Sequence, residues 1–201
     1  MTVALVTMRR DYFPDYKEYR DSIDPKLIDF LQLFDIQVVL IPNHFANFEA
    51  IVNHISCDIV ILSGGGSVNE NDTESLDRIH IENYLIDHAI RNNKKVFGIC
   101  RGMQAILKYF KNPMKSIENH VRLRHNLIDQ NGQVVTNVNS YHNNGFNNIS
   151  DREIDVLYRA PDNTIECIKH SKYNIMGVMW HPEREENFKE FDINLFKGFL
   201  Q

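Results

Sequence analysis

Short apolar runs and amphipathic segments alternate along the first half of the chain. The apolar runs that predict buried strands lie at residues 3–7, 37–41, 58–62 and 95–99. The segments whose apolar residues recur at helical spacing lie at residues 25–34, 48–55, 75–92 and 103–110. Asp24-Pro25 supports the first of these helices, because Asp is a preferred N-cap residue and Pro fits the first helical position. Strands that alternate with helices predict right-handed crossovers and a mostly parallel sheet.

The pattern changes after residue 113, where alternating segments replace the regular exchange of strand and helix. Segments 121–128 and 133–138 flank Asn131-Gly132, a dipeptide that is a strong hairpin signal in such a position. The remaining predicted elements are strands at residues 154–158, 164–168 and 175–179 and a closing helix within residues 188–199. We therefore expect one α/β domain over residues 1–201, with a mostly parallel central sheet flanked by helices and a C-terminal antiparallel hairpin portion.

Gly98-Ile99-Cys100-Arg101-Gly102 lies where a predicted strand passes directly into a predicted helix. A nucleophile on such a sharp turn needs small neighbours, which the two glycines provide. The helix N-terminus would favour the thiolate form of Cys100, and the backbone N–H of Arg101 would be placed to stabilise an oxyanion. A lone cysteine is more often a buried and inert core residue. The flanking glycines and the strand-to-helix pattern favour the nucleophile instead.

The predicted sheet brings distant residues to one edge. In parallel sheets the ligand lies outside the carboxyl ends of the strands. Arg9, Gly65 and Cys100 each follow a predicted parallel strand, so we expect all three at that edge. His181 follows the strand predicted at 175–179, and Glu183 lies two residues further on, where it can orient the imidazole. These residues together suit a cysteine nucleophile with a histidine base.

Three motifs in this order resemble the class I, triad-type glutamine amidotransferase and γ-glutamyl hydrolase superfamily. They are Ser63-Gly64-Gly65-Gly66 after an apolar strand, Gly98-x-Cys100-x-Gly102-x-Gln104, and His181-Pro182-Glu183. The resemblance covers nearly the whole chain, residues 1–201. It implies a catalytic triad of Cys100, His181 and Glu183, with an oxyanion hole that includes the backbone of Gly65.

The same resemblance implies how a γ-glutamyl group would be bound. Gln104 matches a family residue near the glutamyl chain. Val138, Asn139, Ser140 and Tyr141 match the segment whose backbone contacts the α-amino and α-carboxylate groups. The match ends after His142, because stand-alone hydrolases of this type usually continue with His-Gln, whereas this chain has Asn143-Asn144. The departure concerns the part of the pocket that receives the leaving group.

Composition narrows the choice of partners. The formal net charge of −5 argues against a general nucleic-acid-binding protein. The 3 cysteines are widely spaced and odd in number, which suits a reducing compartment, and Cys57 and Cys167 lie in or beside apolar runs typical of a core. We find no signal peptide and no apolar run of the ~20 residues needed to span a bilayer. We expect a cytoplasmic protein without membrane association.

No cofactor or metal motif stands out. The chain has no GxGxxG, and its glycine run lacks the Lys-Ser/Thr of a P-loop. His120, His125 and His142 show neither HExxH spacing nor paired cysteines, so we expect hairpin or surface histidines and no metal ligand.

Three functions remain open at this point. The chain is a free-standing hydrolase that acts on a small γ-glutamyl substrate, a glutaminase subunit that passes ammonia to a partner synthase, or a binding protein with a vestigial site. The apparently intact triad disfavours the third. The segment after the first strand contains Arg9 and Arg10, which would suit an anionic leaving group in a hydrolase. The same residues are equally typical of a solvated loop with paired charges.

Overall fold

The computed structural model describes residues 1–44, 48–69 and 75–201. Within these residues a nine-stranded sheet has the order β4-β1-β5-β6-β13-β12-β11-β8-β9. Its parallel part consists of β4 (Ile36–Ile41), β1 (Thr2–Thr7), β5 (Ile59–Leu62), β6 (Lys95–Ile99) and β13 (Ile175–Val178). Its antiparallel part consists of β12 (Ile165–His170), β11 (Ile154–Arg159), β8 (Val121–Ile128) and β9 (Val134–Tyr141).

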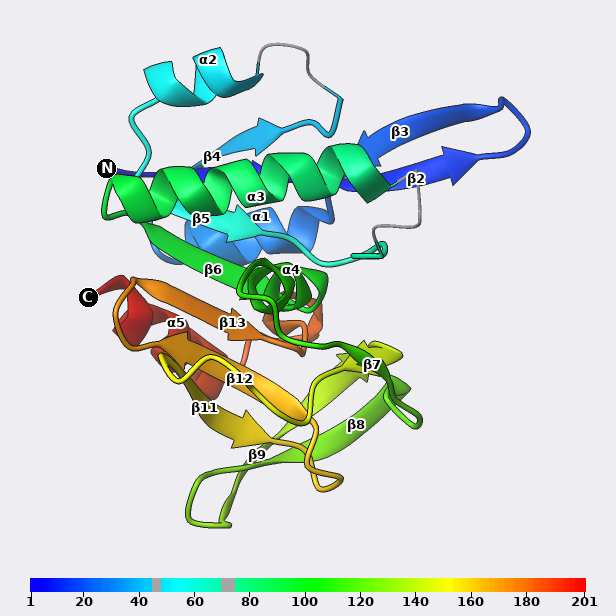
Figure 1. Cartoon of the computed structure of the whole chain (residues 1–201), viewed down its shortest axis with the longest axis vertical. Coiled ribbons are helices and arrows are strands. Elements are labelled where there is room, and N and C mark those ends of the chain that lie inside the picture. Colours follow the sequence, from blue (N-terminus) through cyan, green and yellow to red (C-terminus); the bar gives the residue numbers. More distant parts are fainter. Residues whose placement is uncertain (45–47, 70–74) are drawn as a thin grey trace.

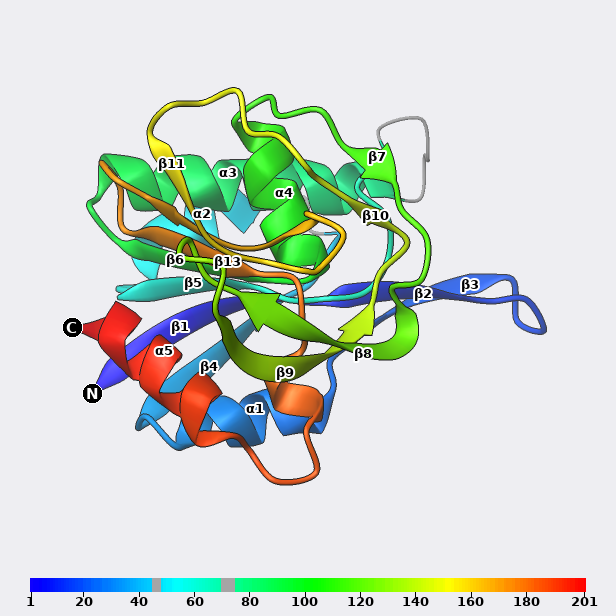
Figure 2. The ribbon, with the colours of Figure 1, turned by 90° about the horizontal axis from the view of Figure 1, so that it is seen from below.

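Helices cover both faces of this sheet (Figure 1 and Figure 2). The helices are α1 (Pro25–Gln32), α2 (Phe48–His54), α3 (Leu76–Arg91), α4 (Arg101–Tyr109) and α5 (Glu190–Leu200). Figure 2 shows α2, α3 and α4 on one side of the sheet and α1 and α5 on the other. The expected α/β class, with a mostly parallel central sheet flanked by helices, is confirmed. The antiparallel part is larger than the hairpin alone, because β11 and β12 belong to it.

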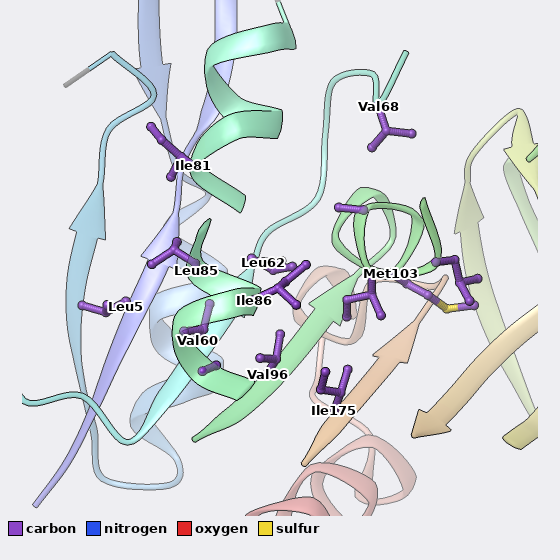
Figure 3. Close-up of a cluster of buried hydrophobic side chains, with 14 of the residues drawn as sticks. Leu5, Val60, Leu62, Val68, Ile81, Leu85, Ile86, Val96, Met103 and Ile175 are labelled. Carbon is purple, nitrogen blue, oxygen red and sulfur yellow. The ribbon is translucent and has the colours of Figure 1, made fainter. Parts of the chain in front are cut away.

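Two apolar cores lie on the two faces of the sheet. Side chains of successive strand residues point to opposite faces, so a strand covered on both sides is apolar at every position. In β5, Val60 and Leu62 join the core beneath α3 and α4, whereas Ile59 and Ile61 join the core beneath α1 and α5. Figure 3 shows the first of these cores, where Leu85 of α3 and residues of the strands pack together. The four buried residues of β5 thus explain the unbroken apolar run at 59–62.

Local capping fixes where the first helix begins. The Asp24 side chain accepts a hydrogen bond of 3.0 Å from the backbone N–H of Lys26, and Pro25 occupies the first helical turn. This agrees with the Asp-Pro signal in the sequence. The cap satisfies one of the free N–H groups that every helix N-terminus presents.

The segment after β1 is a hairpin rather than an irregular loop. Strands β2 (Arg9–Phe13) and β3 (Glu18–Ser22) pair antiparallel and project beyond the carboxyl ends of the parallel strands (Figure 1). Arg20 lies over the rings of Phe13 and Tyr16, at 4.4 Å and 5.2 Å from their centroids. Among the described residues, no helix is both long and apolar enough to cross a membrane.

Candidate active site

Cys100 is at the junction of β6 and α4, in a backbone conformation that is rare for any residue with a side chain. Its φ is 50° and its ψ is −103°, which places it in a strained region. The turn is tight enough that a Cβ atom at Gly102 would lie 2.0 Å from the carbonyl oxygen of Leu62. Gly102 is therefore required for α4 to pack against β5, and it is one of the two small residues that the sequence pattern placed beside Cys100. The Cys100 side chain is only 6% exposed, so the thiol lies inside the site rather than on an open rim.

His181 and Glu183 are brought to Cys100 by the pairing of β6 with β13. Ile99 pairs with Val178, and the Cys100 N–H donates a hydrogen bond of 2.7 Å to the Val178 carbonyl. The chain then turns into the short 3₁₀ helix η2 (Pro182–Arg184), where His181 Nδ1 lies 2.6 Å from Glu183 Oε1. A carboxylate only accepts, so Nδ1 carries the proton and Nε2 is left for Cys100.

The charges of these groups shift one another's pKa. Burial raises the pKa of the Cys100 thiol, but the charge of His181 and its hydrogen bond lower it more, so that the pKa falls below its ordinary value. Burial lowers the pKa of His181, whereas the charges of Cys100 and Glu183 raise it, with a net rise to about 9. Each shift favours the charged form of its own group, so the pair is biased toward a thiolate beside an imidazolium. That is the state of an activated cysteine nucleophile.

Asn139, on β9, holds His181 in place. Its side-chain N–H donates to the His181 carbonyl at 2.8 Å and to Glu185 Oε1 at 3.0 Å, and its Oδ1 accepts from the His181 N–H at 2.9 Å. The sequence pattern placed Asn139 in the substrate-binding segment. In the structure its side chain is buried and is used to fix the backbone of His181.

A buried arginine organises the glycine-rich loop after β5. Arg78, on α3, donates to the carbonyl oxygens of Ser63 at 2.6 Å, Gly64 at 3.4 Å and Gly65 at 2.7 Å. Because a trans peptide places its C=O and N–H on opposite sides, these bonds turn the N–H groups of the loop away from Arg78. Gly65 adopts a φ of 82°, which favours glycine. The loop is thereby held in one conformation.

Arg78 belongs to a buried ionic network that connects the loop to the elbow. Its Nε donates to Glu82 Oε1 at 2.9 Å, and the other oxygen of Glu82 accepts from Arg101 Nη1. Arg101 Nε also donates to the Ser67 carbonyl at 2.9 Å. Burial and the nearby Arg101 lower the pKa of Arg78 to about 10, so Arg78 stays charged at neutral pH. Arg78 and Glu82 were not singled out by the sequence, where an i, i+4 pair on a helix resembles a surface salt bridge.

These groups surround a cavity of about 450 Å³. The lining residues that the sequence predicted are Arg9, Gly65, Cys100, Arg101, Gln104, Tyr141 and His181. Further lining residues include His142, Asn143, Asn144 and Arg184. None of the described residues that line this cavity is acidic, whereas Arg9 and Arg184 contribute positive charge. The parallel-sheet argument, which placed Arg9, Gly65 and Cys100 at one edge, agrees with this cavity.

Other predicted residues lie outside this cavity lining. Val138, Asn139 and Ser140 are buried, and Ser140 Oγ donates to the His120 carbonyl at 2.6 Å. Arg10 does not face the cavity, because it is ion-paired with Asp77 at 3.0 Å and lies 3.7 Å from Asp21. Alternate residues of a strand point to opposite faces, so only one of the two consecutive arginines reaches the site.

The three histidines expected in the hairpin or on the surface lie in or at the ends of the β8–β9 hairpin, but two of them are buried. His120 and His142 are each 4% exposed, and both lie beside the buried Glu166. His142 also lines the cavity with Cys100. Among the described residues, His120, His142 and Glu166 form a group with the geometry to hold a metal ion.

The sequence of the chain is similar to those of known proteins. The family model for class-I glutamine amidotransferases matches residues 16–200. The chain is 34% identical to the γ-glutamyl-CDP-amidate hydrolase of Campylobacter jejuni over 136 residues, which cover 67% of this chain and 66% of that protein. It is 25% identical to the γ-glutamyl-γ-aminobutyrate hydrolase of Escherichia coli O157:H7 over 58% of this chain and 56% of that protein. The chain thus aligns with just under two thirds of the first relative's length and with a smaller share of the second.

Solved structures share the fold. A glutamine amidotransferase from Thermotoga maritima superposes with a TM-score of 0.67 and 13% identity, covering 99% of this chain and 84% of that chain. A chain in the structure of PurLQS from the same organism superposes with a TM-score of 0.68 and 17% identity, covering 99% of this chain and 97% of that chain. At such identities the superposition supports the architecture alone.

Proposed function

Since the chain belongs to the class-I glutamine amidotransferase family, we propose that it is a cysteine hydrolase of γ-glutamyl amides. Cys100 is the nucleophile, His181 the general acid and base, and Glu183 the residue that orients His181. The observation that supports this proposal most directly is the geometry around His181. Its Nδ1 lies 2.6 Å from Glu183 Oε1, and its charge and hydrogen bond lower the pKa of the Cys100 thiol. No cofactor takes part in the proposed reaction.

In the first half-reaction the Cys100 thiolate attacks the γ-carbonyl carbon of the substrate. The oxyanion of the tetrahedral intermediate is stabilised by the backbone N–H groups of Gly65 and Arg101. His181 then donates its Nε2 proton to the leaving nitrogen, the C–N bond breaks, and a γ-glutamyl thioester remains on Cys100. In the second half-reaction His181 accepts a proton from water, and the resulting hydroxide attack releases glutamate and restores the thiolate.

The cavity suggests how the glutamyl group is held. Gln104, one turn into α4, lines the cavity and donates to the Asn144 carbonyl at 3.1 Å. Tyr141 also lines the cavity, with its ring edge-on to His181 at 5.7 Å between centroids. We assign the α-amino and α-carboxylate groups to the backbone at Val138–Tyr141, of which Tyr141 reaches the cavity surface. The side chains of Asn139 and Ser140 support this segment from behind.

The substrate we propose is γ-glutamyl-CDP-amidate, which hydrolysis converts to glutamate and cytidine diphosphoramidate in capsular phosphoramidate synthesis. The relative with 34% identity carries this activity in its name. A cavity without acidic lining residues, with Arg9 and Arg184 at its walls, suits the diphosphate of the leaving group. Arg9 Nε donates to Asp11 at 2.5 Å, and its terminal amino groups have no hydrogen-bond partner among the described residues. Those groups are therefore available to a phosphate.

The test of this proposal is a comparison of two substrates. We expect kcat/KM for γ-glutamyl-CDP-amidate to exceed that for glutamine, because ammonia as a leaving group makes no contact with Arg9. A glutaminase subunit predicts the reverse order and stimulation by a partner synthase. Glutamine as the better substrate of the isolated protein would therefore contradict the hydrolase assignment.

The structure makes the two arginines of β2 a matched pair for the same assay. Arg9→Ala should raise KM for γ-glutamyl-CDP-amidate roughly tenfold or more, as expected for a charge-assisted contact worth ~1.5–3 kcal/mol. Arg10→Ala is the control, because Arg10 is paired with Asp77 outside the cavity. Neither change should alter the slow hydrolysis of glutamine. Equal effects of both substitutions would show that the diphosphate is not bound at Arg9.

The pKa shifts predict a bell-shaped dependence of kcat/KM on pH. Activity should rise as the Cys100 thiol ionises, at a pH below its ordinary pKa, since only the thiolate attacks. It should fall near pH 9, where His181 loses the proton that the leaving group needs. Glu183→Gln removes a charge that raises the pKa of His181, so the basic limb should move to lower pH. A basic limb unchanged in Glu183→Gln would contradict the assignment of that limb to His181.

A further inference from the structure

Three histidines and one glutamate form a buried cluster beside the cavity, and one of the histidines, His142, also lines the cavity. Glu166 Oε1, on β12, lies 3.5 Å from His142 Nε2 and 3.6 Å from His120 Nδ1. Glu166 Oε2 lies 3.4 Å from His125 Nε2, on β8. The carboxylate of Glu166 is fully buried, and the side chains of His120 and His142 are 4% and 1% exposed. None of these four residues has a role in the reaction proposed above.

The atoms that converge in this cluster have no hydrogen-bond partner. Both oxygens of Glu166, His120 Nδ1, His142 Nε2 and both ring nitrogens of His125 are buried and unpaired among the described residues. An unpaired buried polar group costs about 1–3 kcal/mol, and more when it is charged. So many unpaired groups in one place indicate that something occupies the space between them.

The outer hydrogen bonds show which nitrogen of each ring faces inward without a proton. His120 Nε2 lies 3.0 Å from Asp162 Oδ2, and His142 Nδ1 lies 3.2 Å from the Asn144 carbonyl. A carboxylate and a carbonyl only accept, so these two outer nitrogens carry the protons. In the neutral rings the lone pairs of His120 Nδ1 and His142 Nε2 then point at the carboxylate of Glu166. Two lone pairs and a negative charge repel one another unless a cation lies between them.

The separations favour a metal ion over additional protons. A hydrogen bond from an imidazolium to a carboxylate spans about 2.7–2.9 Å. Ligands at about 2.0–2.1 Å from a tetrahedral zinc ion are about 3.3–3.4 Å apart. The two separations between a histidine nitrogen and Glu166 Oε1, 3.5 Å and 3.6 Å, are close to this value. The three ligand atoms all lie within 4.8 Å of one another, so small movements of the two rings would bring them onto one ion. The bond from His120 to Asp162 is also the outer contact that metal-bound histidines usually make.

We propose that this cluster is a structural site for a divalent transition metal, with zinc as the preferred ion. Its ligands are His120 Nδ1, His142 Nε2 and Glu166 Oε1, and His125 is placed to close the fourth side. The site joins the ends of the β8–β9 hairpin to β12. It fixes the strand that carries Asn139 and Tyr141 beside His181. This proposal differs from the expectation from sequence that no metal is bound, and it does not depend on the identity of the substrate.

The experiment measures zinc binding with the catalytic thiol removed, because Cys100 and His181 can also hold zinc. Cys100→Ser protein is treated with chelator, dialysed with Zn²⁺ and analysed for metal. We expect about one zinc per chain, and a rise in Tm of about 5–10 °C at a free zinc concentration one hundred times the Kd. His142→Gln and Glu166→Gln, each in the Cys100→Ser protein, should bind much less than one zinc per chain. The control His80→Gln, whose side chain is 70% exposed, should retain it.

X-ray absorption at the zinc edge provides a readout that needs no substitution in the cluster. The proposal predicts nitrogen and oxygen ligands at about 2.0–2.1 Å and no sulfur at about 2.3 Å. Less than about one tenth of an equivalent of zinc in folded Cys100→Ser protein would overturn the proposal. So would a sulfur ligand, or unchanged zinc affinity in both His142→Gln and Glu166→Gln. If the cluster holds only protons, the folded Cys100→Ser protein will contain almost no zinc.

Discussion

Cys100→Ala will lower glutamate release by about 10⁴–10⁶-fold, the range found when a member of a catalytic triad is removed. His181→Ala should cost nearly as much, and the double variant hardly more, because the two residues act as one unit. The reason lies in the geometry, since Cys100 is the thiol whose pKa is lowered by His181. Release of glutamate under single-turnover conditions measures the effect.

Cys57→Ala is the matched control for this result. Cys57 is a buried thiol whose pKa is raised by burial, so it should contribute nothing to turnover. Iodoacetamide should correspondingly label Cys100 faster than Cys57 or Cys167, whose pKa is also raised by burial. Near-normal turnover by folded Cys100→Ala would remove this residue from the mechanism. Substantial activity in His181→Ala would call for another base, and His142 at the cavity wall is the first candidate.

The second large effect is expected from Arg78→Met. This substitution removes the donors that hold the carbonyl oxygens of Ser63, Gly64 and Gly65. The loop then loses the fixed orientation of its N–H groups, and the oxyanion loses a preorganised donor. Loss of one such donor costs about 10²–10³-fold in kcat. KM should change much less, because the oxyanion exists only in the transition state.

A kcat effect separate from KM distinguishes positioning from loss of stability. Each buried carbonyl left without a donor also costs about 1–3 kcal/mol, so a lower Tm is expected as well. Arg91→Met on the same helix is the control, because Arg91 is exposed and both its hydrogen bond to the Asp87 carbonyl and its contact with the Tyr84 ring lie within α3. If folded Arg78→Met kept its kcat at a temperature well below its Tm, the network would be purely structural.

The parts of the site that follow strands were predictable from sequence. The glycines around Cys100 have one steric purpose, and the structure places a hypothetical Cβ at Gly102 against Leu62. The carboxyl ends of parallel strands meet at one edge whatever the side chains are, so Arg9 and Gly65 were placed beside Cys100 without further information. Both features depend on the backbone and on the order of strands and helices, which can be predicted from the local sequence pattern.

The parts that depend on burial were not predictable. Arg78 and Glu82 form an i, i+4 pair that is typical of an exposed helix face, and only the packing of α4 makes it a buried network. Arg9 and Arg10 look alike in sequence, whereas the pairing of β2 with β3 sends one to the cavity and the other to Asp77. Tertiary contacts decide which polar groups become buried, and a local sequence pattern does not predict those contacts.

The same holds for the buried histidine cluster. His120, His142 and Glu166 come from the start of one strand, the end of the next and a third strand further along the chain. Metal motifs in sequence rest on two ligands within one turn or helix, and this cluster has no such pair. Its members become recognisable only when the register of the antiparallel strands is known.

The register between β6 and β13 has a consequence for how the protein is made. Gly98 pairs with Gly177 and Ile99 with Val178. Cys100 and His181 are therefore brought together by a pairing between strands that lie far apart in the sequence. Parallel pairings of this kind form late, because a long loop must close first. We therefore expect Cys100 to be an ordinary, weakly reactive thiol on the ribosome until His181 has emerged and β13 has docked. The growing chain would then carry no reactive thiolate. The rate at which iodoacetamide labels Cys100 would report when β13 has joined the sheet.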